Sequence, residues 1–196
     1  MEGPFISPAK KGAQGDEFIQ APDFDVFKAF YDGCGGIIRL VDIAPECDVR
    51  GDFIEKASKL CTVSVAHTAT DYDGAKAAFR RGATHATHLF NAMSGMTHRA
   101  PGVVGAVFES EHVTAELICD CFHLHPATLR IVFRHLGASR ICIISDSMRA
   151  AGMPDGVSEL GGQTVYVKHG EARLKDGTIA GSTTNLLKEV QNLVSW

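Results

Sequence analysis

The sequence predicts an α/β protein built mainly as a partial (β/α)8 barrel, followed by a small antiparallel β element. Three observations support this fold. Short apolar segments alternate with helical patterns. Successive predicted strands begin roughly 23 to 29 residues apart, which is the length of one β/α unit and favours parallel strands. About five such units fit in 196 residues, whereas a complete barrel needs ~250.

The first predicted elements follow one another without long gaps, and two glycines end helices. In chain order they are a strand at 37–43, a helix at 52–60, a strand at 62–66, a helix at 72–81, a short strand before His88, a strand at 113–119, a helix at 126–136 and a strand at 141–144. Gly82 and Gly137 stand where helix C-caps favour glycine. The strand at 141–144 is entirely apolar, which suits a strand covered on both faces.

The alternation then changes. Segments 164–168 and 171–174 flank His169-Gly170, and Lys175-Asp176-Gly177 supplies a second turn, so an antiparallel meander is expected. Ser182 or Thr183 is expected to cap a final amphipathic helix with Asn185, Leu186, Leu187, Val190 and Val194 along it. We therefore assign residues 1–160 to the barrel part, 161–182 to the second β element and 183–196 to a helix returning to the barrel.

Composition excludes several classes of protein. The net charge of -4 and scattered basic residues give no surface for nucleic acid. No apolar run approaches the ~20 residues that span a bilayer, so a soluble cytoplasmic protein is expected. The six cysteines lack a C-x-x-C spacing and are expected to be reduced and buried. Cys119-Asp120-Cys121 could present two thiolates on one strand face, but two donors alone rarely form a metal site.

Four side chains point to hydrolytic chemistry. Glu2 provides a carboxylate near the start, and apolar runs end at His67, His88 and Asp146. Parallel barrels assemble hydrolytic metal centres from such strand ends. Each residue also has a simpler explanation. Glu2 alone would be a frayed terminal charge, the histidines could be packing residues, and Asp146 could cap a helix near Met148.

Six segments, in order, resemble the N-acetylglucosamine-6-phosphate deacetylase family of the amidohydrolase superfamily. They are Glu2-Gly3-Pro4-Phe5-Ile6, Val65-Ala66-His67-Thr68, Thr87-His88-Leu89-Phe90-Asn91-Ala92-Met93, 120–126, Ser145-Asp146 with Ala150-Ala151-Gly152, and 177–182. The resemblance implies a (β/α)8 TIM-type barrel, of which about strands 3 to 8 are present, and part of a small β-sandwich. It also implies that the chain is truncated at both ends.

The resemblance implies a role for each candidate residue. Glu2, His67 and His88 would bind one divalent ion, zinc or iron, with manganese or cobalt as alternatives, and Asp146 would transfer protons. The residues implied for substrate are Gln14 at the oxyanion, Asn91 and Ala92 at the phosphate, His123 and Arg99 at the sugar phosphate, and Ala13, Ile179, Ala180 and Gly181 at the sugar. The implied assembly is a homodimer in which Arg99 reaches the neighbouring site.

The implied reaction is removal of the acetyl group from N-acetylglucosamine 6-phosphate, giving glucosamine 6-phosphate and acetate. Two alternatives remain open: a barrel remnant that keeps the motifs without catalysing, and a hydrolase acting on another N-acyl amino sugar or a cyclic amide. Cys121 and Ser147 depart from the glycine and alanine common in the family, which alters the expected pocket near His123.

Overall fold

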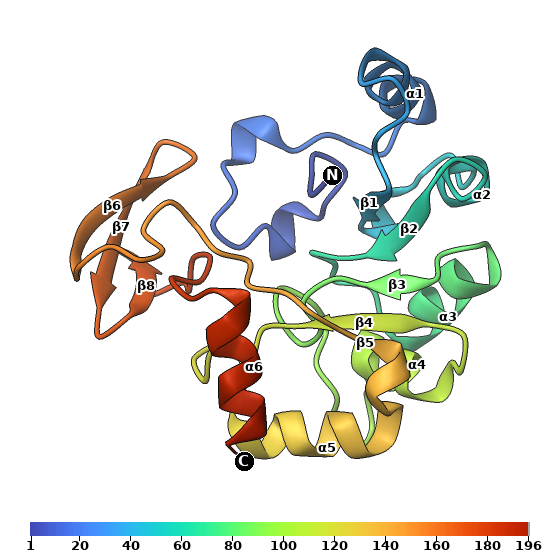
Figure 1. Ribbon diagram of the computed structural model, residues 1–196. Helices are drawn as coiled ribbons and strands as arrows, with labels where there is room; N and C mark the ends of the chain where they lie inside the picture. The colour runs from blue at the N-terminus through green and yellow to red at the C-terminus, as the bar shows by residue number, and fades with distance from the viewer. Residues whose placement is uncertain (196) are drawn as a thin grey trace. The chain divides into compact units, whose positions relative to one another are not determined.

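A parallel sheet carries the first part of the chain and an antiparallel sheet the second (Figure 1). The computed structural model describes residues 1–195. Its first unit comprises Met1–Lys11 and Asp16–Ala115, and its second comprises Gly12–Gly15 and the chain from Glu116 onward. Among the described residues, no helix is both long and apolar enough to cross a membrane.

The parallel sheet confirms the predicted alternation. Its strands are β1 (Leu40–Ile43), β2 (Thr62–Val65), β3 (His85–Ala86), β4 (Thr114–Leu117) and β5 (Ile141–Ile143), hydrogen-bonded in that order. β1 to β4 pair in parallel, for example Val65 with Ala86. In parallel sheets the strand ends that carry functional loops lie at one edge, and this edge positions the candidate site.

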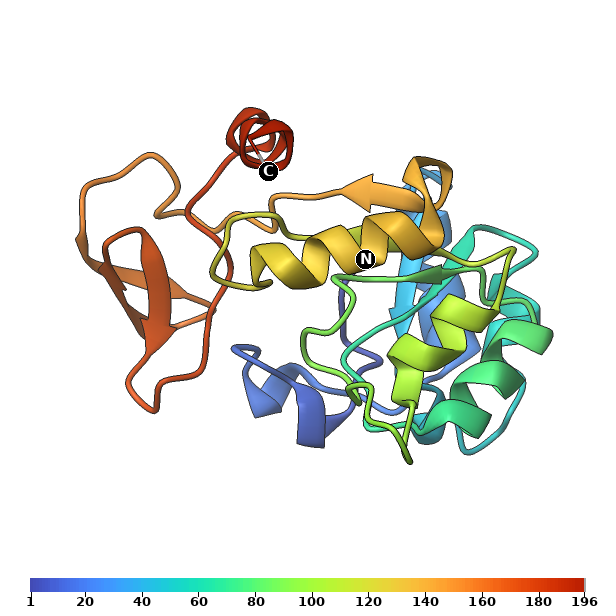
Figure 2. The same cartoon turned by 90° about the horizontal axis from the view of Figure 1, so that it is seen from below.

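Four α-helices belong to the first unit: α1 (Phe24–Gly33), α2 (Phe53–Ala57), α3 (Tyr72–Arg80) and α4 (Gly102–Glu109). The side chains of Asp23 and Asp71 cap α1 and α3 by accepting backbone N–H groups. α3 and α4 pack side by side (Figure 2). The sequence did not predict α1 or α4, and α2 is shorter than the expected helix at 52–60. Short 3-10 helices lie at Pro8–Lys10, Asp16–Phe18 and Pro45–Cys47 in this unit and at Ala138–Arg140 in the second unit.

The N-terminal segment is fixed to this unit by packing and by backbone hydrogen bonds. Phe5 is fully buried, with its ring centroid 5.0 Å from that of Phe53. Met1 O accepts the Asp42 N–H at 3.0 Å, and Phe5 O accepts the Ala44 N–H at 2.9 Å. This segment therefore runs beside β1 and holds Glu2 in place. The alternative of Glu2 as a frayed terminal charge is wrong.

The second unit contains the predicted meander with one additional strand. Its elements are α5 (Pro126–Leu136), β6 (Gly156–Leu160), β7 (Gln163–Lys168), β8 (Glu171–Leu174) and α6 (Leu186–Val194). β6, β7 and β8 pair antiparallel in sequence order. Met148, Val165, Ala172 and Ala180 form much of the apolar cluster under this sheet. Gln163 Nε2 donates to Ala13 O at 2.6 Å, which attaches the 12–15 segment to the unit.

Two expectations about burial are wrong. β5 is not covered on both faces, because its Cys142 is exposed and its two isoleucines are only partly buried. The cysteines are unpaired as expected, but of the six only Cys119 is buried, and Cys34 and Cys121 are exposed. Apolar neighbours in sequence predict a strand or helix, but they do not decide which face another element covers.

Helix α6 also differs from its prediction. Asn185, rather than Ser182 or Thr183, caps the helix by accepting the Lys188 N–H. The leucines and valines expected to pack are exposed, whereas Glu189 is fully buried. The helix therefore presents a carboxyl group to the interior of its unit.

Candidate metal centre

The two candidate histidines leave the sheet at equivalent places. His67 lies two residues beyond β2 and His88 two residues beyond β3. Both have left-handed backbones, with φ of 43° for His67 and 32° for His88. Residues other than glycine rarely adopt this conformation, which costs on the order of 1–3 kcal/mol and persists mainly at functional sites. These turns direct both rings toward the same point.

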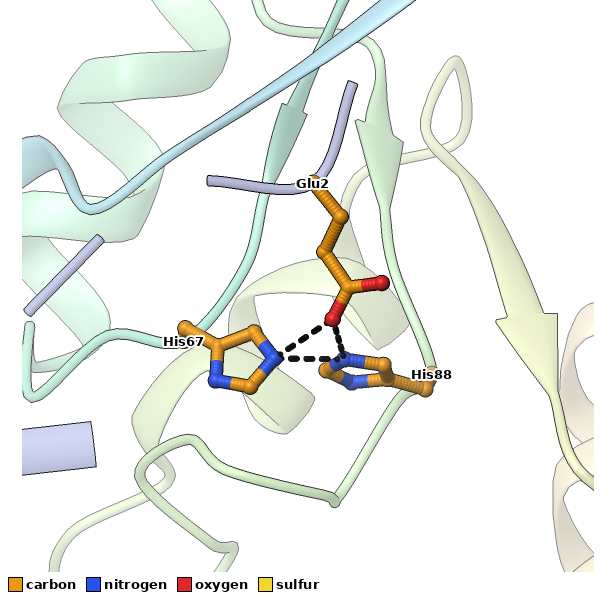
Figure 3. Close-up of side chains that lie close together, drawn as sticks. All are labelled: Glu2, His67 and His88. Atoms are coloured by element: carbon orange, nitrogen blue, oxygen red, sulfur yellow. Dashed lines mark hydrogen bonds and ion pairs between the residues drawn. The ribbon is translucent and has the colours of Figure 1, made fainter. Parts of the chain in front are cut away.

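Glu2, His67 and His88 converge there (Figure 3). His67 Nε2 lies 2.9 Å from Glu2 Oε1 and 3.0 Å from His88 Nε2. The third side, from His88 Nε2 to Glu2 Oε1, measures 3.6 Å. Ligand atoms ~2.0–2.1 Å from a tetrahedral zinc are about 3.3 Å apart. The donor set and its spacing therefore fit a divalent cation.

The hydrogen bond on the far side of His67 fixes which nitrogen is free for a cation. Nδ1 lies 2.7 Å from the carbonyl oxygen of Lys10, which can only accept, so Nδ1 carries a proton. In the neutral ring Nε2 then presents its lone pair toward Glu2 and His88. Metal-binding histidines are commonly oriented by a carbonyl in this manner. Electron-rich atoms this close require a proton or a cation among them.

Burial and charge distinguish the three donors. The side chains of His67 and His88 are 7% and 4% exposed, while that of Glu2 is 41% exposed. When a proton rather than an ion lies at the Nε2 atoms, hydrogen bonds from His67 and then His88 hold the pKa of Glu2 well below its usual range, despite the opposing effect of burial. Glu2 is thus a permanent anion at neutral pH. A fixed anion beside two imidazoles is a ligand set that favours a divalent ion.

Glu46, which the sequence analysis did not single out, supports the loop after β2. Its carboxylate accepts hydrogen bonds from the Thr68 hydroxyl and from the Ala69 N–H. The Thr68 N–H in turn donates to Ala92 O at 3.0 Å, which joins the loops that follow β2 and β3. Glu46 therefore fixes the residue next to His67. Because Glu46 and Thr68 are 22 positions apart, no local pattern signals the contact.

A buried polar network lies on the strands beneath these ligands. The Thr87 hydroxyl donates to Asp42 Oδ1 at 2.7 Å, and Ser64 Oγ lies 2.7 Å from Thr87 Oγ1. Burial raises the pKa of Asp42 to about 6, against the lowering effect of the Thr87 hydrogen bond. Thr87 directly precedes His88, so this network ties β1 and β2 to the turn that carries His88. In the sequence, the signal for this network is Asp42, a charged residue inside an otherwise apolar strand.

Asn91 and Ala92 lie in the loop that follows His88. Asn91 N–H donates to His88 O at 2.9 Å, and Ala92 has a left-handed backbone with φ of 49°. Arg99 is exposed in the next loop, beside a turn in which Thr97 N–H donates to Ala100 O. The backbone thus forms a tight loop at Asn91 and Ala92, whereas the long Arg99 side chain projects from the surface of its unit.

Asp146 belongs to the second unit, where it follows β5. Its φ is 45°, so it shares the left-handed conformation of the two histidines. Asp146 O accepts the Ser182 N–H at 2.7 Å, and Ser182 O accepts the Met148 N–H at 2.9 Å. A Cβ at Gly181 would meet Asp146 O at 2.8 Å, so this position favours glycine. No helix begins near Met148, so Asp146 does not cap one among residues 1–195.

His123 forms a buried ion pair in the same unit. Its Nδ1 lies 2.7 Å from Asp120 Oδ2, and the two side chains are 7% and 5% exposed. Asp120 Oδ1 also accepts the N–H groups of Phe122 and His123. Burial opposes both charges, but the hydrogen bond and the charge of each partner outweigh it. The pKa of Asp120 is lowered and that of His123 is raised.

The remaining predicted sugar-binding residues are also in the second unit. His123 Nε2 lies 3.2 Å from Ala180 O, and Ala180 N–H donates to Ala172 O of β8. Ile179 forms an isolated bridge with Arg173. Ala13 packs against the apolar cluster of the antiparallel sheet, and Gln14 follows it, partly exposed. The turn at Ile179-Ala180-Gly181 is thus adjacent both to His123 and, through Gly181, to Asp146.

Comparisons with known proteins found similar chains among curated proteins and solved structures. No family model matches the chain. It is 43% identical over 183 residues to the N-acetylglucosamine-6-phosphate deacetylase of Bacillus subtilis (strain 168), covering 93% of this chain and 46% of that protein. It is 34% identical over 195 residues to the N-acetylgalactosamine-6-phosphate deacetylase of Escherichia coli O157:H7, and this match covers 99% of this chain and 52% of that protein.

A solved structure gives the same result. A variant of the N-acetyl-D-glucosamine-6-phosphate deacetylase of Mycobacterium smegmatis, in complex with N-acetyl-D-glucosamine-6-phosphate, superposes with a TM-score of 0.92 at 36% identity. The match covers 99% of this chain and 51% of that one. The chain spans about half the length of the curated relatives it matches.

Proposed function

Because the chain belongs to the N-acetylglucosamine-6-phosphate deacetylase family, we propose that it is a metal-dependent hydrolase acting on N-acetylglucosamine 6-phosphate. The products are glucosamine 6-phosphate and acetate. The observation that carries the proposal is the convergence of Glu2, His67 and His88, whose ligand atoms all lie within 4.8 Å of one another. Neither packing nor a frayed end explains an anion and two imidazoles directed at one point.

Glu2, His67 and His88 would hold a single divalent ion, zinc or iron, with manganese and cobalt accepted by the same donors. When bound, such an ion lowers the pKa of a water molecule toward ~7 and polarises the acetyl carbonyl. The chain's own contribution is to fix the donors. Lys10 O holds the His67 tautomer and Glu46 holds the loop beside it.

Asp146 is proposed to move the protons. It accepts a proton from the attacking water and delivers it to the amine, which leaves poorly unless protonated. One hydrogen bond, from the Ser182 N–H to Asp146 O, and the close packing of Gly181 against that oxygen fix its backbone. Gln14 would assist the oxyanion, and one donor of that kind is usually worth ~3–4 kcal/mol.

The proposed recognition of the substrate uses the predicted residues. Asn91, Ala92, Arg99 and His123 would bind the phosphate, with a guanidinium and an imidazolium supplying positive charge. Ala13 and the Ile179-Ala180-Gly181 turn would line the sugar. We further propose a cytoplasmic homodimer in which Arg99 reaches the neighbouring site. Mixing Arg99→Ala with Glu2→Gln protein tests this, because subunit exchange should restore one intact site per dimer.

The direct test is acetate release by the purified, metal-loaded chain from N-acetylglucosamine 6-phosphate. Glu2→Gln, which keeps the size of the side chain but removes its charge, should abolish both metal retention and acetate release. Stoichiometric metal without any acetate release would instead identify a barrel remnant that keeps the motifs but does not catalyse.

N-Acetylgalactosamine 6-phosphate is a second candidate substrate, because a relative named for that substrate aligns over 99% of this chain. The two sugars differ only in the configuration of one hydroxyl. Comparing kcat/KM for the two phosphates, under the same metal loading, decides between them. Ring-opening hydrolysis of a cyclic amide, without acetate release from either sugar, would overturn both proposals.

A further inference from the structure

Two polar side chains on α6 bind the backbone of one residue, Cys119, which lies two positions beyond the end of β4. Glu189 Oε2 accepts a hydrogen bond from the Cys119 N–H. One helical turn further on, Asn192 Nδ2 donates to Cys119 O at 2.9 Å. The donor and the acceptor of a single residue are therefore both satisfied by side chains of the same helix, in the way a neighbouring strand would satisfy them.

Apolar packing does not explain this arrangement. Glu189 is 0% exposed, whereas Leu187 and Val194 of the same helix are 69% and 82% exposed. Burying a carboxyl group is costly unless it makes hydrogen bonds. Burial raises the pKa of Glu189 to about 7, against the opposing effect of the Cys119 N–H. Its Oε1 atom has no hydrogen-bond partner within residues 1–195. We therefore attribute the burial of the Glu189 carboxyl group to its hydrogen bond with the Cys119 N–H.

Cys119 leads directly to the His123 ion pair. Asp120, the next residue, accepts from the Phe122 and His123 N–H groups and faces His123 Nδ1. On the other side of the ring, Nε2 faces Ala180 O. A carboxylate and a carbonyl oxygen are both acceptors, so both ring nitrogens must carry protons to make the two bonds. The geometry describes an imidazolium.

We infer that Glu189 and Asn192 are positioning residues that hold the Cys119 peptide, so that Asp120 keeps His123 as an imidazolium oriented toward Ala180. This inference rests on the proposed function only in its consequence for catalysis: His123 would offer a fixed positive charge to an anionic sugar ligand. The charged groups that face His123 are Asp120 and Asp146 from its own unit, with Glu189 on the helix behind.

The first test measures His123 without any substrate. Histidine-selective NMR titration of Glu189→Leu and Asn192→Ala should show the His123 pKa lowered by about one unit, because a loosened Asp120 stabilises the cation less. Glu189→Gln retains an acceptor for the Cys119 N–H, so in this variant the His123 pKa should stay close to its value in the parent protein. Gln191→Ala, on the exposed face of the same helix, is the matched control and should leave the titration unchanged.

The second test is kinetic. If the chain releases acetate, Asn192→Ala should raise KM for N-acetylglucosamine 6-phosphate about tenfold with little change in kcat, because binding of the anion is affected rather than proton transfer. If the His123 pKa falls in the variants but the parent chain releases no acetate, the positioning inference is supported and the proposed function is contradicted. The two ideas are therefore separable.

The inference is overturned if the His123 titration is the same in Asn192→Ala and in the parent protein while circular dichroism shows an intact fold. Should leucine at position 189 prevent folding, Asn192→Ala still removes one of the two contacts with Cys119 and tests the inference. An unchanged titration in Asn192→Ala would show that α6 only covers this end of the strand.

Discussion

The Nε2 atoms of His67 and His88 lie 3.0 Å apart, and both face Oε1 of Glu2. Two neutral imidazoles this close repel unless a proton or a metal ion lies between their lone pairs. A metal ion bound by these three atoms would remove this repulsion, so their closeness without an ion favours metal binding.

Replacing either histidine should remove the ion. We expect His67→Ala and His88→Ala each to weaken zinc binding at least 100-fold, because two remaining donors rarely form a site. Metal content after gel filtration, and competition with a chromophoric chelator, measure the loss. His112→Ala, an exposed histidine away from the three ligands, is the control and should bind as the parent does. Full retention of zinc by His67→Ala would rule out the proposed ligand set.

Binding of the ion should stabilise the fold. At 100 times Kd a ligand that binds only the native state adds about 2.7 kcal/mol, which corresponds to a Tm increase of about 5 to 10 °C for a chain of this size. Differential scanning fluorimetry with and without zinc, after treatment with a chelator, measures the shift. Glu2→Gln should show little or none of it, and an equal shift in that variant would place the ion elsewhere.

Glu46 should influence metal affinity without touching the ion. Glu46→Ala removes the acceptor for the Thr68 hydroxyl and the Ala69 N–H, so the turn at His67 becomes looser. Loss of groups that orient a ligand typically costs 10–100-fold in affinity. Titration with zinc in a competitive assay tests this, with the exposed Glu111→Ala as the control. Equal affinities for the two variants would show that His67 is held by other contacts.

Glu189 should make stability depend on pH. Its pKa rises from about 4.5 to about 7 on folding, so the unfolded chain loses this proton first as the pH increases. Stability contributed by the protonated carboxyl is therefore present below about pH 4.5 and is lost progressively up to about pH 7. Relative to Glu189→Gln, the parent should lose up to about 3 kcal/mol across this window. Urea unfolding at pH 5 and pH 8 measures the difference, and parallel pH profiles would contradict it.

Arg99 should matter only for the phosphorylated sugar. Arg99→Ala is expected to raise KM for N-acetylglucosamine 6-phosphate by tenfold or more, since a bidentate guanidinium contact with phosphate is lost. The rate with unphosphorylated N-acetylglucosamine should not change. Arg134→Ala, another exposed arginine, serves as the control. An equal loss on both sugars would assign Arg99 a role other than phosphate binding.

The sequence predicted the parallel strands well because their signal is local. The apolar segment before His67 and the one at 113–119 are short, β-branched and bounded by turns, and both became strands. The helix at 126–136 carried its own C-terminal signal, Gly137, and formed with those bounds. Because strand ends in such sheets share one edge, the convergence of His67 with His88 also followed from local patterns.

What the sequence could not predict depends on distant contacts. The burial of Glu189 contradicts the apolar periodicity of its own helix, because its partner, Cys119, lies 70 positions away. Glu46 and Asp42 likewise contact residues that lie 22 and 45 positions away in the sequence. Periodicity shows which face of an element is apolar, but the covering element decides which face is buried. The predicted cap of the last helix failed because Ser182 instead binds Ser145 O and the Asp146 backbone.

The left-handed turns at His67 and His88 put ligand function and thermal robustness in opposition. Glycine adopts such a turn freely, so His88→Gly would relieve the backbone while deleting the donor. In metal-free protein, a chain that has lost its chemistry in this manner could outlast its parent on heating. Screens that select only for solubility or heat resistance would then enrich descendants that have lost the proposed metal centre.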